Sequence, residues 1–196
     1  MNRMFFTRKC YEEYAYVLDY IPTPLKRYKG YRGPVAQVIG ENCFTLLEVA
    51  PYPGVILSTG ERIFIGKGIR DKVERVLRRI SYEDLSPLAR DELPRIVEEI
   101  VTKQEARFVE FFNRAQPLTT KMHSLELLRG IGKKTLWKIL EERKKSPFTS
   151  FEDIKKRIKL PDPKKLIIER ILEEIRGEEK YYIFVAPPPK PSFSRI

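Results

Sequence analysis

The sequence is poor in the residues on which many enzymes depend. It holds a single histidine, so a metal site built on several histidines cannot form, and no Ser/His/Asp set is apparent. No apolar run approaches the roughly 18 residues that a membrane span needs, and residues 1–6 lack the apolar core of a signal peptide. We therefore expect a cytoplasmic protein with no membrane contact, no cofactor and no metal.

Cysteine is almost as rare as histidine. Cys10 and Cys43 do not form a Cys-x-x-Cys pair, which argues for reduced thiols in a reducing cytoplasm and against a disulfide framework. Cys43 alternates with Thr45 and Leu47, so we interpret it as a small core residue.

Charge is abundant and unevenly distributed. The net charge of +11 divides into +6 over residues 1–80, −3 over residues 81–120 and +8 over residues 121–196. Two basic regions separated by an acidic one are typical of two modules that contact nucleic acid, joined by a spacer. A thermophilic surface rich in lysine ion pairs is the alternative explanation.

The first 70 residues have the pattern of a small β structure. Short apolar runs, in part with period-2 alternation, are separated by clusters of proline, glycine and asparagine. We predict a closed or nearly closed barrel of the OB-like type, although an SH3-like barrel would leave much the same pattern. The predicted strands are 14–20, 35–39, 44–50, 55–57 and 62–65.

Helices are predicted from residue 71 onward. The apolar spacing over residues 71–80 indicates a helix, and Ser86 followed by Pro87 indicates the start of another. Thr102 with Glu105 predicts a capping box that opens a helix to about residue 115.

Near the carboxyl end, residues 181–185 are strand-like and are a candidate edge strand of the barrel, and residues 187–191 predict a polyproline II segment. The predicted fold class is α+β. It comprises an OB-like β-barrel (1–80), a helical spacer (81–116), an all-α domain (117–178) and a strand-like segment with a proline-rich tail (179–196).

The most informative stretch is residues 129–135. Its two glycines allow a tight turn with close approach of a ligand, and the aliphatic residue between them can pack beneath the turn. Outward amides at a helix N-terminus favour a phosphate, the lysines add charge, and the threonine adds a donor. The candidate contacts are Arg129, Gly130, Ile131, Gly132, Lys133, Lys134 and Thr135.

This stretch resembles the helix-hairpin-helix motif found in DNA ligases, Holliday-junction binders, excision nucleases and competence DNA receptors. Apolar residues at helical spacing would give its second helix a buried stripe, namely Leu136, Ile139 and Leu140. Residues 146–154 resemble the linker that joins two such motifs in tandem, with Ser150 as the N-cap of the next helix.

A degenerate second copy of the motif would span residues 154–176. Its turn lacks the glycine–aliphatic–glycine pattern and contains Pro161 and Pro163, which have no amide donor. We therefore expect this copy to be a packing partner that does not bind phosphate.

Two further segments are candidate contacts for nucleic acid. In the first, cations and tyrosines alternate, which suits stacking on unpaired bases beside phosphates; a solvated connection with tyrosines folded back on the barrel is the alternative. In the second, residues 66–71 place cations before a predicted helix, where a simple strand-to-helix turn is the preferred interpretation. The residues are Lys26, Arg27, Tyr28, Lys29, Tyr31 and Arg32 in the first segment, and Lys67 and Arg70 in the second.

Catalysis is not expected. Paired glutamates lie on amphipathic helices and look like solvated faces, and a magnesium-dependent nuclease would need carboxylates that converge at strand ends. Four glutamates are the weak candidates for that role: Glu12, Glu13, Glu48 and Glu61.

The order of barrel, spacer and hairpin domain, with residues 124–134 and 66–68, resembles an uncharacterised archaeal family of predicted OB-fold nucleic-acid-binding proteins. The resemblance implies binding of RNA or DNA, with RNA favoured, and no established reaction. The alternative is an adaptor that contacts ribosomal or transcription proteins through the hairpin domain and the proline-rich tail. The sequence does not predict an oligomeric state.

Overall fold

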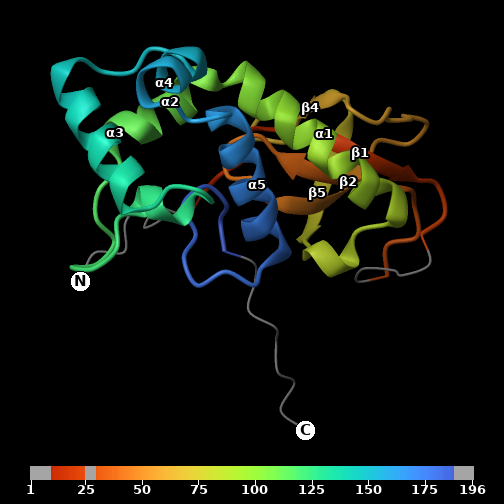
Figure 1. The fold of residues 1–196 in the computed structure, drawn as a ribbon. Coiled ribbons are helices and arrows are strands. Elements are labelled where there is room, and N and C mark those ends of the chain that lie inside the picture. Colours follow the sequence, from red (N-terminus) through yellow and green to blue (C-terminus); the bar gives the residue numbers. More distant parts are fainter. Residues whose placement is uncertain (1–9, 25–29, 188–196) are drawn as a thin grey trace, which may run out of the picture. The chain divides into compact units, whose positions relative to one another are not determined.

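The computed structural model describes residues 10–24 and 30–187 (Figure 1). The chain divides into two compact units, and the dividing points fall inside helices α1 (Pro87–Lys103) and α5 (Pro163–Arg176). Of the described residues, 97–172 form the helical unit, and the remainder, on either side of it in the sequence, form the sheet unit.

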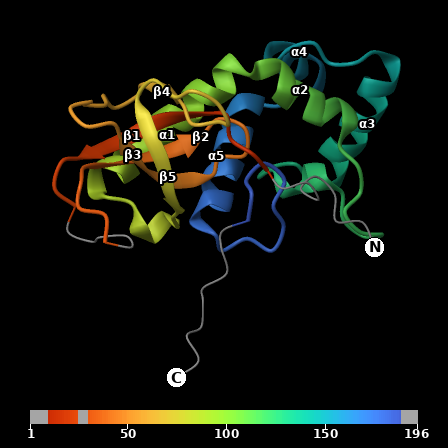
Figure 2. The same ribbon diagram turned by 180° about the vertical axis from the view of Figure 1, so that it is seen from behind.

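The sheet unit is built on five antiparallel strands in the order β4-β1-β2-β3-β5, which curl into a half-barrel (Figure 2). Val38 on β2 pairs with Val17 on β1 and with Leu47 on β3, so the three side chains share one face. The strands are β1 (Tyr14–Ile21), β2 (Val35–Gly40), β3 (Leu46–Pro51), β4 (Arg62–Phe64) and β5 (Val73–Arg79).

That face carries the core of the unit. Burial of aliphatic side chains here is the main source of its stability. The buried cluster comprises Ala15, Val17, Ala36, Val38, Leu47, Val49, Leu57, Ile63, Ile65 and Val73.

Gln37 lies on the opposite face by strand alternation and is buried. Its carboxamide donates to the carbonyl of Asp84 at 2.9 Å and accepts from the amide of Ser86 at 2.8 Å. Ser86 caps α1, as predicted, because its hydroxyl accepts the amide of Ala89 at 3.0 Å. A short 3-10 helix, η1 (Tyr82–Asp84), precedes this cap.

The α+β class and four of the five predicted strands are confirmed. Residues 55–57 form no strand, although Leu57 is buried in the core. The predicted helix over 71–80 is wrong, because residues 73–79 form β5 and pair with β3. Its apolar spacing fits a helix, but pairing along the edge of β3 decides the conformation of a short segment that periodicity alone leaves ambiguous.

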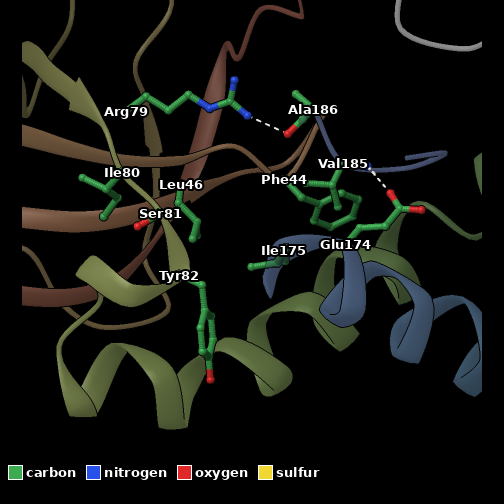
Figure 3. Close-up of a pocket in the computed structure, with 10 residues that line it drawn as sticks. All are labelled: Phe44, Leu46, Arg79, Ile80, Ser81, Tyr82, Glu174, Ile175, Val185 and Ala186. Carbon is green, nitrogen blue, oxygen red and sulfur yellow. Dashed lines mark hydrogen bonds between the residues drawn. The ribbon is translucent and has the colours of Figure 1, made fainter. Parts of the chain in front are cut away.

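The segment 181–185 is not a strand either. The buried carboxylate of Glu174 accepts three of its amides, those of Ile183, Phe184 and Val185, at 2.9 Å each. This arrangement borders a small cavity of about 20 Å³ beside Phe44 (Figure 3). The end of the segment is therefore held by a side-chain carboxylate and not by pairing with a strand. The polyproline segment that follows lies almost entirely outside the described residues.

The helical unit contains the end of α1 and the start of α5. Its fully buried side chains include Phe108, Phe112, Leu125, Leu128, Ile139 and Ile154. Its other helices are α2 (Glu105–Arg114), the 3-10 helix η2 (Ser124–Leu127), α3 (Lys133–Lys145) and α4 (Phe151–Ile158).

Several local predictions in this unit are confirmed. Leu136 and Ile139 are buried on α3. The Ser150 hydroxyl accepts the amide of Asp153 at 3.0 Å and caps α4.

The capping box at Thr102 is wrong. Thr102 lies inside α1, where its hydroxyl donates to the carbonyl of Glu98 at 2.8 Å. The carboxylate of Glu105 accepts the amide of Phe151 instead, at 2.7 Å. Both residues thus satisfy polar groups that the local sequence does not reveal.

Candidate nucleic-acid interface

The glycine turn of residues 128–132 lies directly before α3. Ile131 is 4% exposed, and its amide donates to the carbonyl of Leu128 at 3.1 Å, so the centre of the turn is pinned to the core. Gly130 has φ of 82°, a conformation that side chains disfavour. Gly132 has φ of −85° and is the N-cap of α3. The helix expected before the turn is the four-residue 3-10 helix η2.

The α3 end of this turn is open. The Gly132 N-cap has no side chain to accept the first amides of α3. Apart from the chain neighbours of each glycine, no atom of the described residues lies within 4 Å of a Cβ built on Gly130 or Gly132. A helix N-terminus without a side-chain cap leaves amide donors and a partial positive charge facing outward.

The cations near the turn differ in how they are used. The ammonium of Lys133 contacts Glu126 at 2.8 Å and the carbonyl of Lys121 at 3.1 Å, so it is held back over η2. This ion pair holds the pKa of Glu126 below its usual value. Arg129 and Lys134 are exposed, and Thr135 is half-buried. Lys133 therefore contributes less unbalanced charge than the sequence suggested.

Trp137 is a feature that the sequence analysis missed. It is 64% exposed on α3, at i+4 from Lys133 and i+3 from Lys134, so it lies on the same side of the helix as the two lysines. An indole is large and apolar, and exposure of most of its surface beside cations is unusual for a residue with only a packing role. The signal available in the sequence was a large apolar residue on α3 that lies outside the buried stripe of Leu136 and Ile139.

His123 is the single histidine of the sequence. It is the buried N-cap of η2, where its Nδ1 accepts the amide of Leu125 at 3.2 Å. Burial, reinforced by the nearby Arg143, lowers the pKa of His123. The imidazole has a structural role as an acceptor.

Arg143 lies in the last turn of α3. Its guanidinium donates to the carbonyls of Phe112 and Ala115 at 3.1 and 3.0 Å, so it closes the carboxyl end of α2. Burial lowers the pKa of Arg143. It is therefore not placed among the residues of the interface.

The second turn, between α4 and α5, is closed by its own side chain. The carboxylate of Asp162 accepts the amide of Lys165 at 3.0 Å. Pro163 is the first residue of α5 and has no amide donor. Lys159 adopts the left-handed conformation with φ of 63° at the end of α4. The Asp162 carboxylate thus caps the N-terminus of α5, whereas the N-terminus of α3 has no side-chain cap at Gly132.

In the sheet unit, Lys26, Arg27, Tyr28 and Lys29 lie outside the described residues. Tyr31 is folded back, because its hydroxyl donates to the carbonyl of Pro34 at 3.1 Å and the guanidinium of Arg75 lies 5.1 Å from its ring centre. Burial raises the pKa of Tyr31. Arg32 is exposed.

Lys67 and Arg70 lie in the loop between β4 and β5, and no helix follows them. The guanidinium Nε of Arg70 donates to the carbonyl of Gly66 at 3.0 Å, which closes the loop. Both side chains line a groove of the sheet unit with a volume of about 680 Å³. The structure therefore brings these two sequence-predicted residues together at a cavity.

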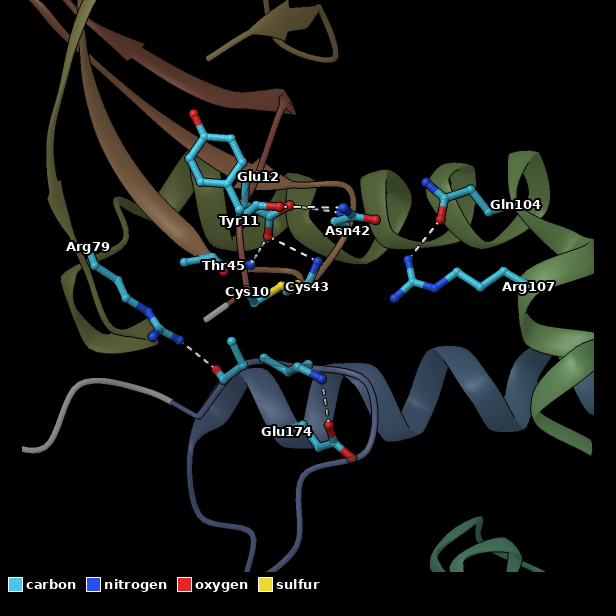
Figure 4. Close-up of a disulfide and its surroundings, with 12 residues drawn as sticks. Cys10, Tyr11, Glu12, Asn42, Cys43, Thr45, Arg79, Gln104, Arg107 and Glu174 are labelled. Carbon is cyan, nitrogen blue, oxygen red and sulfur yellow. Dashed lines mark hydrogen bonds between the residues drawn. A yellow bond between two sulfur atoms is a disulfide. The ribbon is translucent and has the colours of Figure 1, made fainter. Parts of the chain in front are cut away.

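Three of the four glutamates named as weak candidates for metal-dependent chemistry bind other partners in the fold. The Glu12 carboxylate accepts the amides of Asn42, Cys43 and Thr45 at 2.8–3.1 Å (Figure 4). Elsewhere, Glu48 pairs with Arg78 at 2.7 Å and Glu61 pairs with Lys72. These three carboxylates are committed to the fold.

The prediction of reduced thiols is wrong. Cys10, just before β1, and Cys43, in the β2–β3 connection, form a disulfide with a Cα–Cα separation of 6.3 Å (Figure 4). The partner of a cysteine 33 residues away is set by tertiary folding, which the spacing of two isolated cysteines does not encode.

Together these observations describe an α+β protein with a half-barrel, an exposed glycine turn and a basic groove. Among the described residues, none of the helices has the length and apolar content that a bilayer crossing requires.

The chain belongs to the DUF655 family, described as a protein of unknown function, whose model matches residues 11–186. It is 46% identical over 194 residues to the uncharacterized protein MJ0038 of Methanocaldococcus jannaschii, covering 94% of this chain and 86% of that protein. The crystal structure of Af1531 from Archaeoglobus fulgidus, which belongs to the same family, is similar with a TM-score of 0.78 and 49% identity. That similarity covers 89% of this chain and all of the Af1531 chain.

Proposed function

We propose that this protein is a cytoplasmic, non-enzymatic nucleic-acid-binding protein, with RNA favoured over DNA, and that the turn at residues 129–135 holds backbone phosphate. The observation that carries the proposal is the contrast between the two turns of the helical unit. At Gly132 the N-cap residue of α3 has no side chain that could accept the first amides of the helix, whereas at the second turn the N-cap side chain of Asp162 accepts one. A backbone phosphate would meet the same donors that a carboxylate cap meets.

The surroundings of the turn support a nucleic-acid backbone as its ligand. Arg129 and Lys134 are exposed beside it, and the chain as a whole carries a net charge of +11. Trp137, one turn along α3, offers a ring on which an unpaired base can stack. The proposal treats residues 117–178 as a tandem helix-hairpin-helix domain, with the second copy serving as its support.

The half-barrel is treated as an OB-like module that adds contacts to bases. Phosphate contacts position a protein without reading sequence, so any specificity would have to come from base contacts. The groove beside Lys67 and Arg70 is the part of the sheet unit where positive charge and apolar surface meet.

The test is fluorescence-anisotropy binding of matched single- and double-stranded RNA and DNA at several salt concentrations. If about four phosphates are engaged, log Kd should rise with log salt concentration at a slope of roughly 3 to 4. We expect single-stranded RNA to bind most tightly, because stacking on Trp137 needs an unpaired base. Weak binding without salt dependence, together with partners that stay bound after nuclease and high salt, would favour the protein adaptor instead.

A further inference from the structure

The groove of the sheet unit combines an apolar floor with a cationic rim. Leu47 on β3, Ile65 after β4 and Val76 on β5 contribute the apolar surface. The volume of about 680 Å³ lies within the range of about 300–1,000 Å³ that small-molecule sites occupy.

Three cations line this groove, and they come from separate places in the sequence. Lys67 and Arg70 belong to the β4–β5 loop, and Arg79 ends β5. Within the described part of the chain, no carboxylate forms an ion pair with any of the three. The guanidinium of Arg79 donates to the carbonyl of Ala186 at 2.6 Å, which holds the guanidinium in place without neutralising its charge (Figure 3).

The carboxylate in the groove lining is already satisfied. Glu12 is 7% exposed and accepts three backbone amides of the β2–β3 connection. Its charge therefore offsets only part of the charge of the three cations. An anionic group that enters the groove would gain charge-assisted hydrogen bonds at the rim.

Tyr11 forms an aromatic wall of the same groove. Tyr11 is 43% exposed, and the ammonium of Lys67 lies 5.6 Å from the centre of its ring. A planar ring on the aliphatic floor could contact this wall while a linked anion reaches Lys67.

We propose that this groove binds one nucleotide, with the base on the aliphatic floor beside Tyr11 and the phosphate at Lys67, Arg70 and Arg79. The juxtaposition of an apolar seat and a three-cation rim matches a molecule that is planar at one end and anionic at the other. The same chemistry is offered by a free mononucleotide and by an unpaired nucleotide of a strand. Only the second source rests on the proposed function.

The experiment is isothermal titration of the full chain with AMP, adenosine, inorganic phosphate and a hexamer of adenylate. Lys67→Glu is the test variant, because Lys67 is exposed and, among the described residues, makes no bond on which the loop depends. Arg75→Glu is the matched control: it reverses the same charge on β5, and strand alternation points Arg75 away from the face of Val76. Thermal melts of both variants check that the fold is retained.

We expect AMP to bind more tightly than adenosine or phosphate, Lys67→Glu to weaken AMP binding at least tenfold, and Arg75→Glu to change it less than twofold. The proposal is overturned if AMP does not bind, if phosphate or adenosine alone binds as tightly as AMP, or if the two variants behave alike.

Gly132→Asp separates this proposal from the proposed function. If Gly132→Asp weakens binding of the hexamer but not of AMP, and the hexamer binds the original chain more tightly than AMP does, the occupant is a nucleotide of a strand. If AMP and the hexamer bind equally and Gly132→Asp changes neither, the groove stands as a site for a free nucleotide and the proposed grip at Gly132 fails.

Discussion

The two turns of the helical unit solve the same structural problem in opposite ways. Each leads a short helix into a longer one, and each leaves helix amides that need an acceptor. At the second turn Asp162 accepts the amide of Lys165, and Pro163 removes another donor. At the first turn Gly132 provides no acceptor. The identity of one cap residue, glycine or aspartate, therefore decides whether the helix amides are capped by the protein itself or left open to an external anion.

Converting the first turn into the second should have the largest effect. Gly132 has φ of −85° and open space at its Cβ, so aspartate fits without strain and would cap α3. We expect Gly132→Asp to raise the melting temperature slightly and to weaken binding of single-stranded RNA at least tenfold, measured by anisotropy.

Two matched variants separate charge from shape at this position. Gly132→Asn adds the same cap without the charge and should weaken binding by a smaller factor. Gly132→Ala adds no acceptor and should bind nearly as tightly as the original chain. Equal loss in all three variants would mean that bulk, and not occupation of the amides, explains the effect.

Removal of the stacking ring should come next in size. Trp137→Ala removes a platform that is worth about 1–3 kcal/mol per stacked base. Binding of single-stranded RNA should weaken by that amount, whereas double-stranded RNA should be affected far less. Lys145→Ala, which retains the indole and changes an exposed residue at the end of α3, is the control. The idea fails if single- and double-stranded RNA lose affinity equally.

The glycine with positive φ tests the rigidity of the open turn. Gly130 has φ of 82°, and alanine in this conformation costs about 1–2 kcal/mol. Gly130→Ala should lower the free energy of unfolding by about that amount, measured by urea titration. An unchanged free energy of unfolding would show that the turn adapts to alanine and is not held rigidly in this conformation.

The smallest effect should come from Glu126. Glu126→Gln releases Lys133 from its ion pair and removes a negative charge near the amides, so RNA affinity should rise about two- to threefold. Glu141→Gln, farther along α3, makes the same change of net charge as a control. Lys133 lowers the pKa of Glu126 in the folded chain. The ion pair therefore contributes fully to stability at pH values above the pKa that Glu126 has in the unfolded chain, and this contribution is lost as the pH falls through the lower pKa of the folded chain.

Sequence alone predicted the features that local chemistry decides. The glycine turn at residues 130–132 and the Ser150 cap each follow from residues that are close in the chain, whereas the capping of α5 by Asp162 was not predicted. β5 could not be distinguished from a helix, because its conformation depends on pairing with β3.

Features assembled from distant residues were beyond the sequence. Residues 183–185 are held by Glu174, and Cys10 joins Cys43. The groove was equally hidden: Lys67 and Arg70 were recognised as cations, but the fold alone brings them to Arg79 and Tyr11.

The most direct test uses the single tryptophan of the chain as its own reporter. Trp137 is exposed one turn from Gly132, so titration with single-stranded RNA should quench its fluorescence in a saturable, salt-sensitive manner. We expect the same titration to show little quenching in Gly132→Asp and nearly normal quenching in Gly132→Ala. Unchanged fluorescence in the original chain, or equal quenching in the aspartate variant, would contradict the claim that this turn holds nucleic-acid phosphate.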